Sequence, residues 1–427
     1  MAHESHAQQR RPRLAGVDVA RGVALIGMFI AHLGVPLSAF AVSGDPYAIA
    51  SGSMDPATLA DRVAALVWEG VSGRSAALFA MLAGVSLTFI AGRRDVVTSA
   101  TDRRRIRIKI VVRAVVLIVV GVGLSAFGSV AVILHYYGVF FLLALPLLWL
   151  RGRTLALIGG LVVLVGPVIG VLTTSVAEEV TGDAPAAIVG VPHEPFFSYD
   201  LSGGVGDVSA HLELTLPSDG LVDLLASGTY PAVAYMGYVI VGMLVGRLDL
   251  RSRLVRTRLA TIGLVGAVLG YGGSWVLVRL LPTESPKVFG VDAGELLIAD
   301  PHSNTAFEVL GNTGTALVVV GLCLFAADRA GRLLDPLASV GTMTLTLYSA
   351  HIALMWLTEP LASGYGLISV VLAHDAEIYV TAALVLASMW RYRFGRGPLE
   401  RLLASAANGV AERMVPRPRA SAKSVNA

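Results

Sequence analysis

Charge and cysteine are both scarce in this chain. Of its 427 residues, 15% are charged and a single one, Cys323, is a cysteine. One cysteine excludes an intramolecular disulfide and any zinc or iron–sulfur site built from cysteines. A soluble globular domain carries about 25% charged residues, so the composition also excludes an ordinary soluble protein. Because the sequence has no His-x-x-x-His motif and no carboxylate cluster, we expect no metal site.

Apolar residues, by contrast, make up 55% of the chain. They recur in runs of about 20 residues, which is the length that a helix needs to cross a bilayer. The sequence therefore predicts an all-α fold, a polytopic membrane bundle of about ten transmembrane helices. The ten predicted spans are residues 14–37, 70–91, 108–127, 130–150, 154–174, 228–247, 259–281, 306–326, 338–358 and 377–391. An eleventh is expected if the short apolar segment at 362–373 also crosses.

Positive charge gathers at alternate ends of these spans. The basic clusters include Arg151 and Arg153, residues 247–258 and residues 391–401. This positive-inside pattern predicts that both termini are cytoplasmic. We expect a multi-pass protein of the cell membrane, with the lipid bilayer as a partner. The net charge of +3 comes from these clusters. We therefore expect no nucleic-acid partner.

The same topology divides the chain into three regions. Residues 1–13 form a cytoplasmic tail, residues 14–403 form the membrane domain, and residues 404–427 form a cytoplasmic tail that is predicted to be disordered. Residues 38–69 and 175–227 are predicted to be loops on the extracytoplasmic side. The longer loop contains acidic residues, proline and glycine, so we expect it to form a folded cap.

Three ionisable residues interrupt the first predicted span: Asp18, Arg21 and His32. Eleven residues separate Arg21 from His32, so on a helix they lie within roughly 20° of each other and about 16 Å apart along the axis. Asp18 lies one turn before Arg21 and can pair with it. Ionisable groups at membrane depth are costly and usually line a cavity or a bundle interior. This face is therefore predicted to line a site.

Other polar residues converge on the outer half of the bundle in the predicted topology. We expect them to bind a substrate near His32, and they are Arg74, His135, Tyr136, Asn312, Tyr348 and His351. On the cytoplasmic side, the run Arg103, Arg104 and Arg105 is most simply a topology determinant. The sharper alternative is that these arginines bind the phosphates of a cofactor or an anionic lipid.

The first-span residues resemble the arginine–histidine signature of transmembrane acyltransferases. The string from Leu14 to Met28, Leu-x-x-Val-Asp-Val-Ala-Arg-Gly-Val-Ala-Leu-Ile-Gly-Met, is similar to the membrane family named for heparan-α-glucosaminide N-acetyltransferase. The resemblance to bacterial relatives of that group extends over residues 14–403. The further matching segments are residues 73–79 with Gly84, residues 229–249, residues 339–351 and residues 390–400.

This resemblance implies acyl transfer from cytoplasmic acyl-CoA, most simply acetyl-CoA, to a hydroxyl or amine of an extracytoplasmic glycan or glycolipid. Carried over by position, His32 is the catalytic histidine and Arg21 the essential first-span arginine, with Asp18 as its partner. Membrane relatives are often dimers, which suggests a homodimer.

Elementary chemistry agrees with that implication. Acyl transfer from a thioester needs a base or a nucleophile, and histidine can serve as either. Arg74, Asn312 or Tyr348 could donate hydrogen bonds to the oxyanion. The phosphates of CoA would stay at the cytoplasmic ends of the spans while its pantetheine arm reaches past Arg21 toward His32.

Two readings from other classes stay open. A transporter or flippase for a lipid-linked or anionic solute could use the same polar face, although no internal repeat supports it. A non-catalytic scaffold would need Asp18 and Arg21 only as an ion pair that fixes helix packing. On that reading His32 and His135 are interfacial residues, His135 within an aromatic belt.

Overall fold

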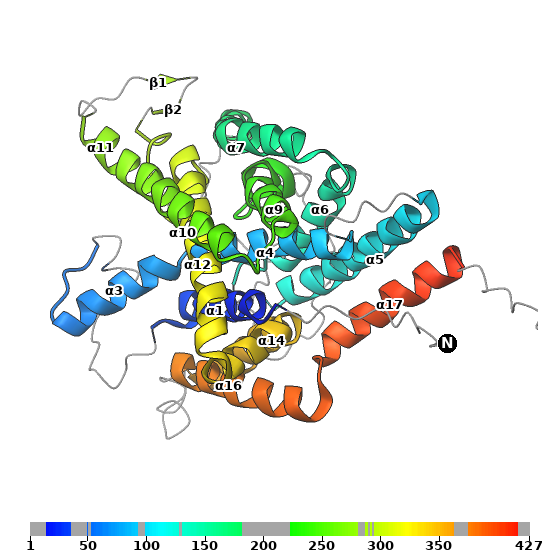
Figure 1. Cartoon of the computed structure of the whole chain (residues 1–427). Helices are drawn as coiled ribbons and strands as arrows, with labels where there is room; N and C mark the ends of the chain where they lie inside the picture. The colour runs from blue at the N-terminus through cyan, green and yellow to red at the C-terminus, as the bar shows by residue number, and fades with distance from the viewer. Residues whose placement is uncertain are drawn as a thin grey trace, which may run out of the picture.

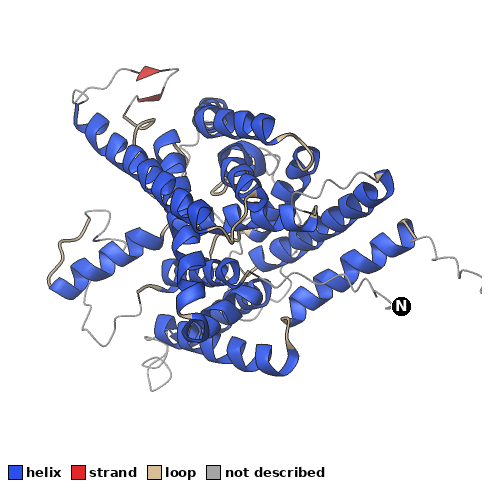
Figure 2. Cartoon of the chain, in the orientation of Figure 1, coloured by secondary structure: helices blue, strands red, loops and turns tan. Residues whose placement is uncertain are grey.

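The computed structural model describes residues 14–35, 49, 53–92, 99–127, 130–181, 223–280, 287–288, 291–292, 294–362 and 375–416. These residues are almost entirely helical, which confirms the predicted all-α fold (Figure 2). Most of the predicted loop at 175–227 and residues 363–373 of the short apolar segment lie outside the described residues.

The described chain is a series of helices. The long helices are α1 (Ala15–Leu33), α3 (Leu59–Val71), α4 (Arg74–Ile90), α5 (Ala100–Ser125), α6 (Leu134–Ala144), α7 (Gly152–Thr181), α9 (Ala232–Arg247), α10 (Arg253–Ala267), α12 (Ala306–Arg329), α14 (Thr344–Ala362), α16 (Asp375–Phe394) and α17 (Pro398–Met414). Shorter pieces are the turns Leu145–Leu147, Asp223–Ser227, Val268–Gly272 and Gly331–Leu334, and the helices α11 (Gly273–Leu280) and α13 (Asp335–Thr342). Two strands, β1 (Lys287–Val288) and β2 (Val291–Asp292), pair antiparallel.

Six helical stretches of the described chain are long and apolar enough to cross a membrane, or seven if a bent pair forms one span. They are Ala15–Leu33, Leu59–Ile90, Ala100–Ser125, Gly152–Gly170, Arg253–Leu280, Ala306–Arg329 and the bent pair Gly331–Thr342 with Thr344–Thr358. Two shorter apolar helices, Leu134–Leu147 and Ala232–Arg247, coincide with the fourth and sixth predicted spans. Charged residues at both ends of α16 keep the tenth predicted span off this list. The chain is thus a multi-pass membrane protein, while the count of ten and the side of the termini stay predictions.

Helix α1 lies near the centre of the bundle, against α4, α12 and α13 (Figure 1). Small residues allow the closest of these contacts. A Cβ on Gly22 would collide with the backbone carbonyl of Leu337 on α13, and one on Gly341 would collide with the carbonyl of Asp18. Because lipid offers no hydrophobic drive to associate, helices in membranes rely on such close backbone packing. The α1–α13 contact therefore fixes where the first span stands relative to the ninth.

Helices α4 and α9 make a second close contact of the same kind. A Cβ on Gly84 would meet the carbonyl oxygen of Val239, and a Cβ on Gly242 would meet that of Met81. Both methionine and valine neighbours are completely buried in the core. Reciprocal glycines thus hold α4, which follows the predicted outer loop, against α9.

The ninth predicted span, residues 338–358, is broken rather than continuous. Helices α13 and α14 meet at Met343 with a bend of 70°. The carboxylate of Glu400, on α17, accepts hydrogen bonds from the amides of Leu345 and Thr346 at 2.8 and 3.1 Å and from the Thr346 hydroxyl at 2.6 Å. A helix start leaves amide donors without partners inside the helix. Glu400 accepts from two of these amides, so the ninth predicted span is bent within residues 338–358.

The structure also places helices in two regions predicted to lack them. Helix α3 occupies the end of the predicted loop at 38–69, and its N-terminus has a capping box in which Thr58 and Asp61 exchange hydrogen bonds. Helix α17 continues past residue 403 to Met414, so residues 404–414 are helical rather than disordered. Its Ala407 and Ala411 are fully buried, and the helix packs on α5, where Arg105 donates to the carbonyl of Val415 at 2.6 Å.

Gly84→Ala or Gly242→Ala should force α4 and α9 apart and destabilise the protein by about 1–3 kcal/mol, the usual cost of overpacking a core. Thermal unfolding of the purified variants in detergent measures this. Gly160→Ala on α7 is the matched control, because nothing lies within 4 Å of a Cβ at that position. Equal midpoints for all three variants would show that the glycine contacts do not set the helix spacing.

Glu400→Gln should weaken the bend between α13 and α14. The two carboxylate oxygens of Glu400 accept from three donors, whereas a glutamine amide has only one oxygen that can accept. We expect a lower unfolding midpoint and faster hydrogen exchange at Leu345 and Thr346. Glu412→Gln, at an exposed position of the same helix, is the control. Unchanged exchange in Glu400→Gln would mean that the bend is held by packing alone.

Candidate functional site

His32 and His351 meet directly, although 319 residues separate them in the chain. The Nδ1 atom of His32, in the last turn of α1, lies 3.0 Å from Nε2 of His351 on α14. The two rings are nearly parallel, with centroids 5.3 Å apart. His351 is completely buried, whereas His32 is half-buried. Of two imidazoles in this arrangement, one ring nitrogen donates and the other accepts.

Aromatic side chains hold the ring of His351 in place. Phe29, one turn before His32 on α1, packs on it with a centroid distance of 4.7 Å, and Tyr348, one turn before it on α14, packs edge-on at 4.9 Å. The hydroxyl of Tyr348 accepts a hydrogen bond from the backbone amide of Ile133 at 3.1 Å. That contact brings the start of α6 to the histidine pair, so three elements converge there.

His135 and Tyr136 arrive on this start of α6, as the sequence predicted. The ring of His135 packs on Tyr136 with centroids 4.4 Å apart, and Tyr136 in turn meets Tyr230 edge-on at 5.5 Å. Tyr230 is near enough to Tyr348 for the two phenols to interact electrostatically. Five predicted residues thus belong to one aromatic cluster with Phe29 and Tyr230: His32, His135, Tyr136, Tyr348 and His351.

Asp18 and Arg21 form the predicted pair, with 3.0 Å between Oδ1 of Asp18 and Nη1 of Arg21. The other guanidinium nitrogen, Nη2, donates to the hydroxyl of Ser86 on α4 at 2.6 Å. Asp18 is buried, and 21% of the Arg21 side chain is exposed. Ser86 could not be predicted from the sequence, because no local pattern in an apolar helix identifies one serine as the partner of a distant arginine.

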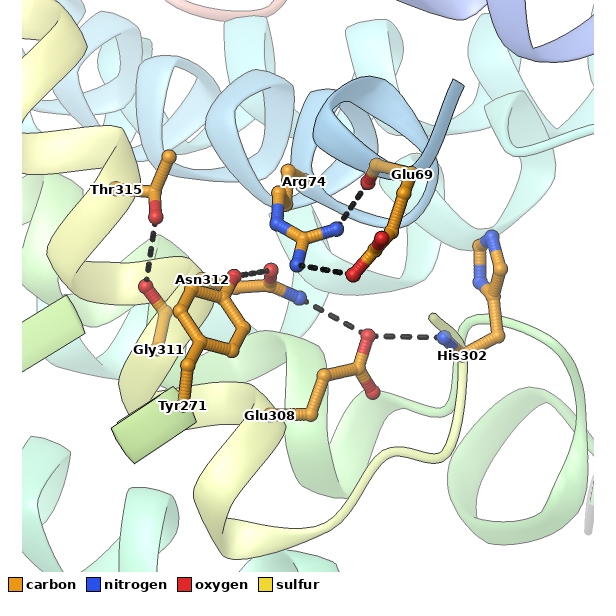
Figure 3. A network of polar contacts seen from close by, with 8 residues as sticks. All are labelled: Glu69, Arg74, Tyr271, His302, Glu308, Gly311, Asn312 and Thr315. Atoms are coloured by element: carbon orange, nitrogen blue, oxygen red, sulfur yellow. Dashed lines mark hydrogen bonds and ion pairs between the residues drawn. The ribbon is translucent and has the colours of Figure 1, made fainter. Parts of the chain in front are cut away.

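Arg74 and Asn312 belong to a second polar network, centred on Glu308 (Figure 3). Asn312 donates to Oε1 of Glu308 at 3.0 Å and to the Tyr238 hydroxyl at 3.3 Å, and it accepts from the hydroxyl of Tyr271 at 2.6 Å. The Arg74 guanidinium lies over the Tyr271 ring, 4.6 Å from its centroid. The sequence placed Glu308 and Asn312 on one face of the eighth span, but only Asn312 was chosen as a site residue; Glu308 is buried.

Arg74 is tied to α3 as well. Its guanidinium donates to the carbonyl of Glu69, and Nη2 lies 4.0 Å from the Glu69 carboxylate. Between these residues the chain turns at Gly73, whose φ of +66° is left-handed. A Cβ there would lie 3.0 Å from Oε1 of Glu308. Glycine thus lets the turn before α4 close directly over the Glu308 carboxylate.

The three arginines predicted to bind phosphates differ in their surroundings. Arg105 is buried between Asp102, 3.4 Å away, and the carbonyl of Val415, so it anchors α17. Arg103 is half-buried, with its guanidinium 5.8 Å from the ring of Trp149, and Arg104 is exposed. Only Arg103 and Arg104 leave their charge accessible to a ligand.

Among the described residues, no group of three or more His, Cys, Asp or Glu side chains is placed to hold a metal ion. Cys323 is a buried free thiol on α12.

Comparison with known families agrees with this geometry. Residues 13–202, which include Asp18, Arg21 and His32, match the family model described as heparan-alpha-glucosaminide N-acetyltransferase, catalytic. Residues 250–409, which include His351, match a second model, described as a protein of unknown function, DUF418. These matches support a membrane acyltransferase family like that of heparan-alpha-glucosaminide N-acetyltransferase. No curated protein matches the chain.

The resemblance expected from the sequence is therefore confirmed. The match over residues 13–202 supports a membrane enzyme of acetyltransferase type. The boundary between the two models falls between residues 202 and 250. The His32–His351 pair joins one matched region to the other.

Proposed function

We propose that this protein is a cell-membrane acyltransferase that moves an acyl group, most simply acetyl, from cytoplasmic acyl-CoA to a hydroxyl or amine of an extracytoplasmic glycan or glycolipid. The contact between His32 and His351 is the observation that carries the proposal. Two imidazoles at hydrogen-bonding distance form a base with an orienting partner, a recurrent arrangement in acyl transfer.

In this mechanism His351 orients His32. The bond to Nε2 of His351 occupies Nδ1 of His32. The other ring nitrogen of His32, Nε2, is then the atom that acts on the substrate, because a neutral imidazole has one donor and one acceptor nitrogen. Phe29 and Tyr348 pack on the partner ring, so the direction of the His32 ring is set before substrate binds.

The reaction consists of one substitution at the thioester carbonyl. Nε2 of His32 takes the proton of the acceptor hydroxyl or amine as its oxygen or nitrogen bonds to the carbonyl carbon. The carbon–sulfur bond then breaks, and the thiolate of CoA takes the proton from His32. A route through an acyl-histidine has the same balance, with Nε2 attacking first and the acceptor displacing it.

Tyr348 is the best placed donor for the oxyanion of this step. Its hydroxyl accepts from the Ile133 amide, which leaves its own proton available to donate. Arg74 and Asn312, the other predicted donors, spend their nearest contacts on Glu69, Tyr271 and Glu308. We therefore assign the oxyanion to Tyr348, and assign Arg74, Asn312, His135 and Tyr136 to the acceptor side of the site.

The donor follows α1. Arg21 lies about 16 Å from His32 along the helix axis, which a pantetheine arm can span. Arg21 remains partly exposed while paired with Asp18, so it can bind an amide or phosphate oxygen of the donor. Arg103 and Arg104 supply further positive charge for the phosphates of CoA. The matched family is named for an acetyltransferase of a glucosaminide, which supports a sugar acceptor.

Purified protein in nanodiscs, incubated with radiolabelled acetyl-CoA, should bind the donor and release CoA as the acyl group passes to added glucosamine or to water. His32→Ala should lower CoA release by about 10²- to 10⁴-fold, the usual contribution of a positioned base. His351→Ala should lower the maximal rate while leaving the KM for acetyl-CoA unchanged, because His351 acts through His32. Scintillation counting of product and a thiol assay for CoA measure the two rates.

Thr358→Ala, on the same helix as His351, is the control, and a folded state is checked for each variant by size-exclusion chromatography. Turnover that survives His32→Ala undiminished would contradict the assignment of His32. A wild-type protein that neither binds nor cleaves acyl-CoA of any chain length would contradict the proposed function as a whole.

A further inference from the structure

The Glu308 carboxylate accepts four hydrogen bonds, more than capping one helix end requires. Its Oε1 accepts from the backbone amide of His302 at 2.9 Å and from Asn312 at 3.0 Å. Its Oε2 accepts from the backbone amide of Asn304 at 2.6 Å and from the Ser303 hydroxyl at 3.3 Å. Thr305 separately caps α12 by accepting from the Glu308 amide. Three of the four donors to the carboxylate thus come from the loop before α12, so Glu308 holds that loop.

The loop that Glu308 holds is unusual in its backbone. His302 and Asn304 both have positive φ angles, 65° and 52°, in the left-handed region that residues other than glycine avoid. Such a strained conformation persists only where the surroundings enforce it. Here both left-handed residues give their amides to Glu308, and the turn at Gly73 covers the carboxylate from the other side. The conformation of His302 is therefore imposed.

The imidazole of His302 points away from the carboxylate that binds its amide (Figure 3). It meets the ring of Tyr230 edge-on, with centroids 5.5 Å apart. His302 is near enough to His32 for charges on the two imidazoles to act on each other. Tyr230 also borders Tyr136 and interacts with Tyr348. Through Tyr230, a third histidine thus joins the aromatic cluster that contains the His32–His351 pair.

One ring nitrogen of His302 is available for a ligand. The backbone carbonyl of Thr229 accepts a hydrogen bond from the ring, while Nδ1 is buried and has no hydrogen-bond partner in the structure. Burial lowers the pKa of His302 to about 4, and the bond to Thr229 opposes the shift. The ring is therefore neutral near pH 7, and with its proton on the nitrogen that faces Thr229, Nδ1 has a free lone pair. A buried acceptor of this kind needs a donor.

We propose that His302 is an acceptor-binding residue of the His32–His351 site, and that Glu308 is the positioning residue that presents it. Nδ1 of His302 accepts a hydrogen bond from a hydroxyl or amine of the sugar that receives the acyl group. This inference rests on the proposed function and adds to it the residues that select the acceptor.

The test compares the KM for the acceptor with that for the donor. His302→Asn keeps the left-handed backbone, which asparagine tolerates, and removes the imidazole. We expect its KM for the acceptor to rise at least about tenfold, the cost of one lost hydrogen bond to a substrate. Its KM for acetyl-CoA and its rate of CoA release without acceptor should stay at the wild-type values. The acceptor probe is whichever of glucosamine and methyl glucosides most accelerates wild-type CoA release.

Glu308→Gln should raise the KM for the acceptor in the same way, because it releases the loop that presents His302. The double variant should be no worse than the more affected single variant, since Glu308 acts through His302. Asp300→Asn, at an exposed position of the same loop, is the matched control and should behave as wild type. His302→Gly replaces His302→Asn if the latter does not fold.

The outcomes separate the two proposals. A wild-type enzyme that transfers the acyl group, with an unchanged acceptor KM in His302→Asn, overturns the role of His302 and leaves the proposed function intact. Additive effects of His302→Asn and Glu308→Gln overturn the positioning role of Glu308. A wild-type protein that releases no CoA, with or without a sugar, overturns the proposed function and this inference with it.

Discussion

The close packing of α1 against α13 is the contact on which the candidate site depends. Glycines at positions 22 and 341 bring the two backbones together, and a side chain at either position would collide with a carbonyl of the other helix. The chain then bends by 70° at Met343, so α14 leaves α13 in a new direction and carries His351 to the end of α1. A straight ninth span would follow α13 instead, and the two histidines would not share a site.

The bend, the ion pair and the acceptor-side network obey one constraint. Inside a bilayer, polar groups find partners only within the protein. Glu400 therefore serves the amides freed at the start of α14, Ser86 and Asp18 share the donors of Arg21, and Glu308 serves the loop before α12. Each of these contacts joins elements that are distant in the sequence. The same bonds that satisfy polar groups also fix the relative positions of the helices that form the site.

The sequence predicted the parts of this arrangement that depend on local patterns. Long apolar runs identified the membrane helices, and the spacing of Asp18, Arg21 and His32 identified the polar face of α1. The break at Met343 could not be predicted, because its cap, Glu400, stands 55 residues further along the chain. His302 was missed for a related reason: a histidine in a loop has no periodicity, and its place is set by a carboxylate on the next helix. Helix α17 was missed because its alanine-rich face stabilises it only by packing against α5.

A structure of the protein with a non-hydrolysable acetyl-CoA analogue, in which a methylene group replaces the thioester sulfur, tests the central claim most directly. The account predicts that the carbonyl carbon of the analogue lies within about 4 Å of His32, the contact distance of non-bonded atoms. The chain of the analogue should run along α1 past Arg21, with its phosphates near Arg103 and Arg104. An analogue bound elsewhere, or one that approaches His32 from the opposite end of α1, would contradict the account.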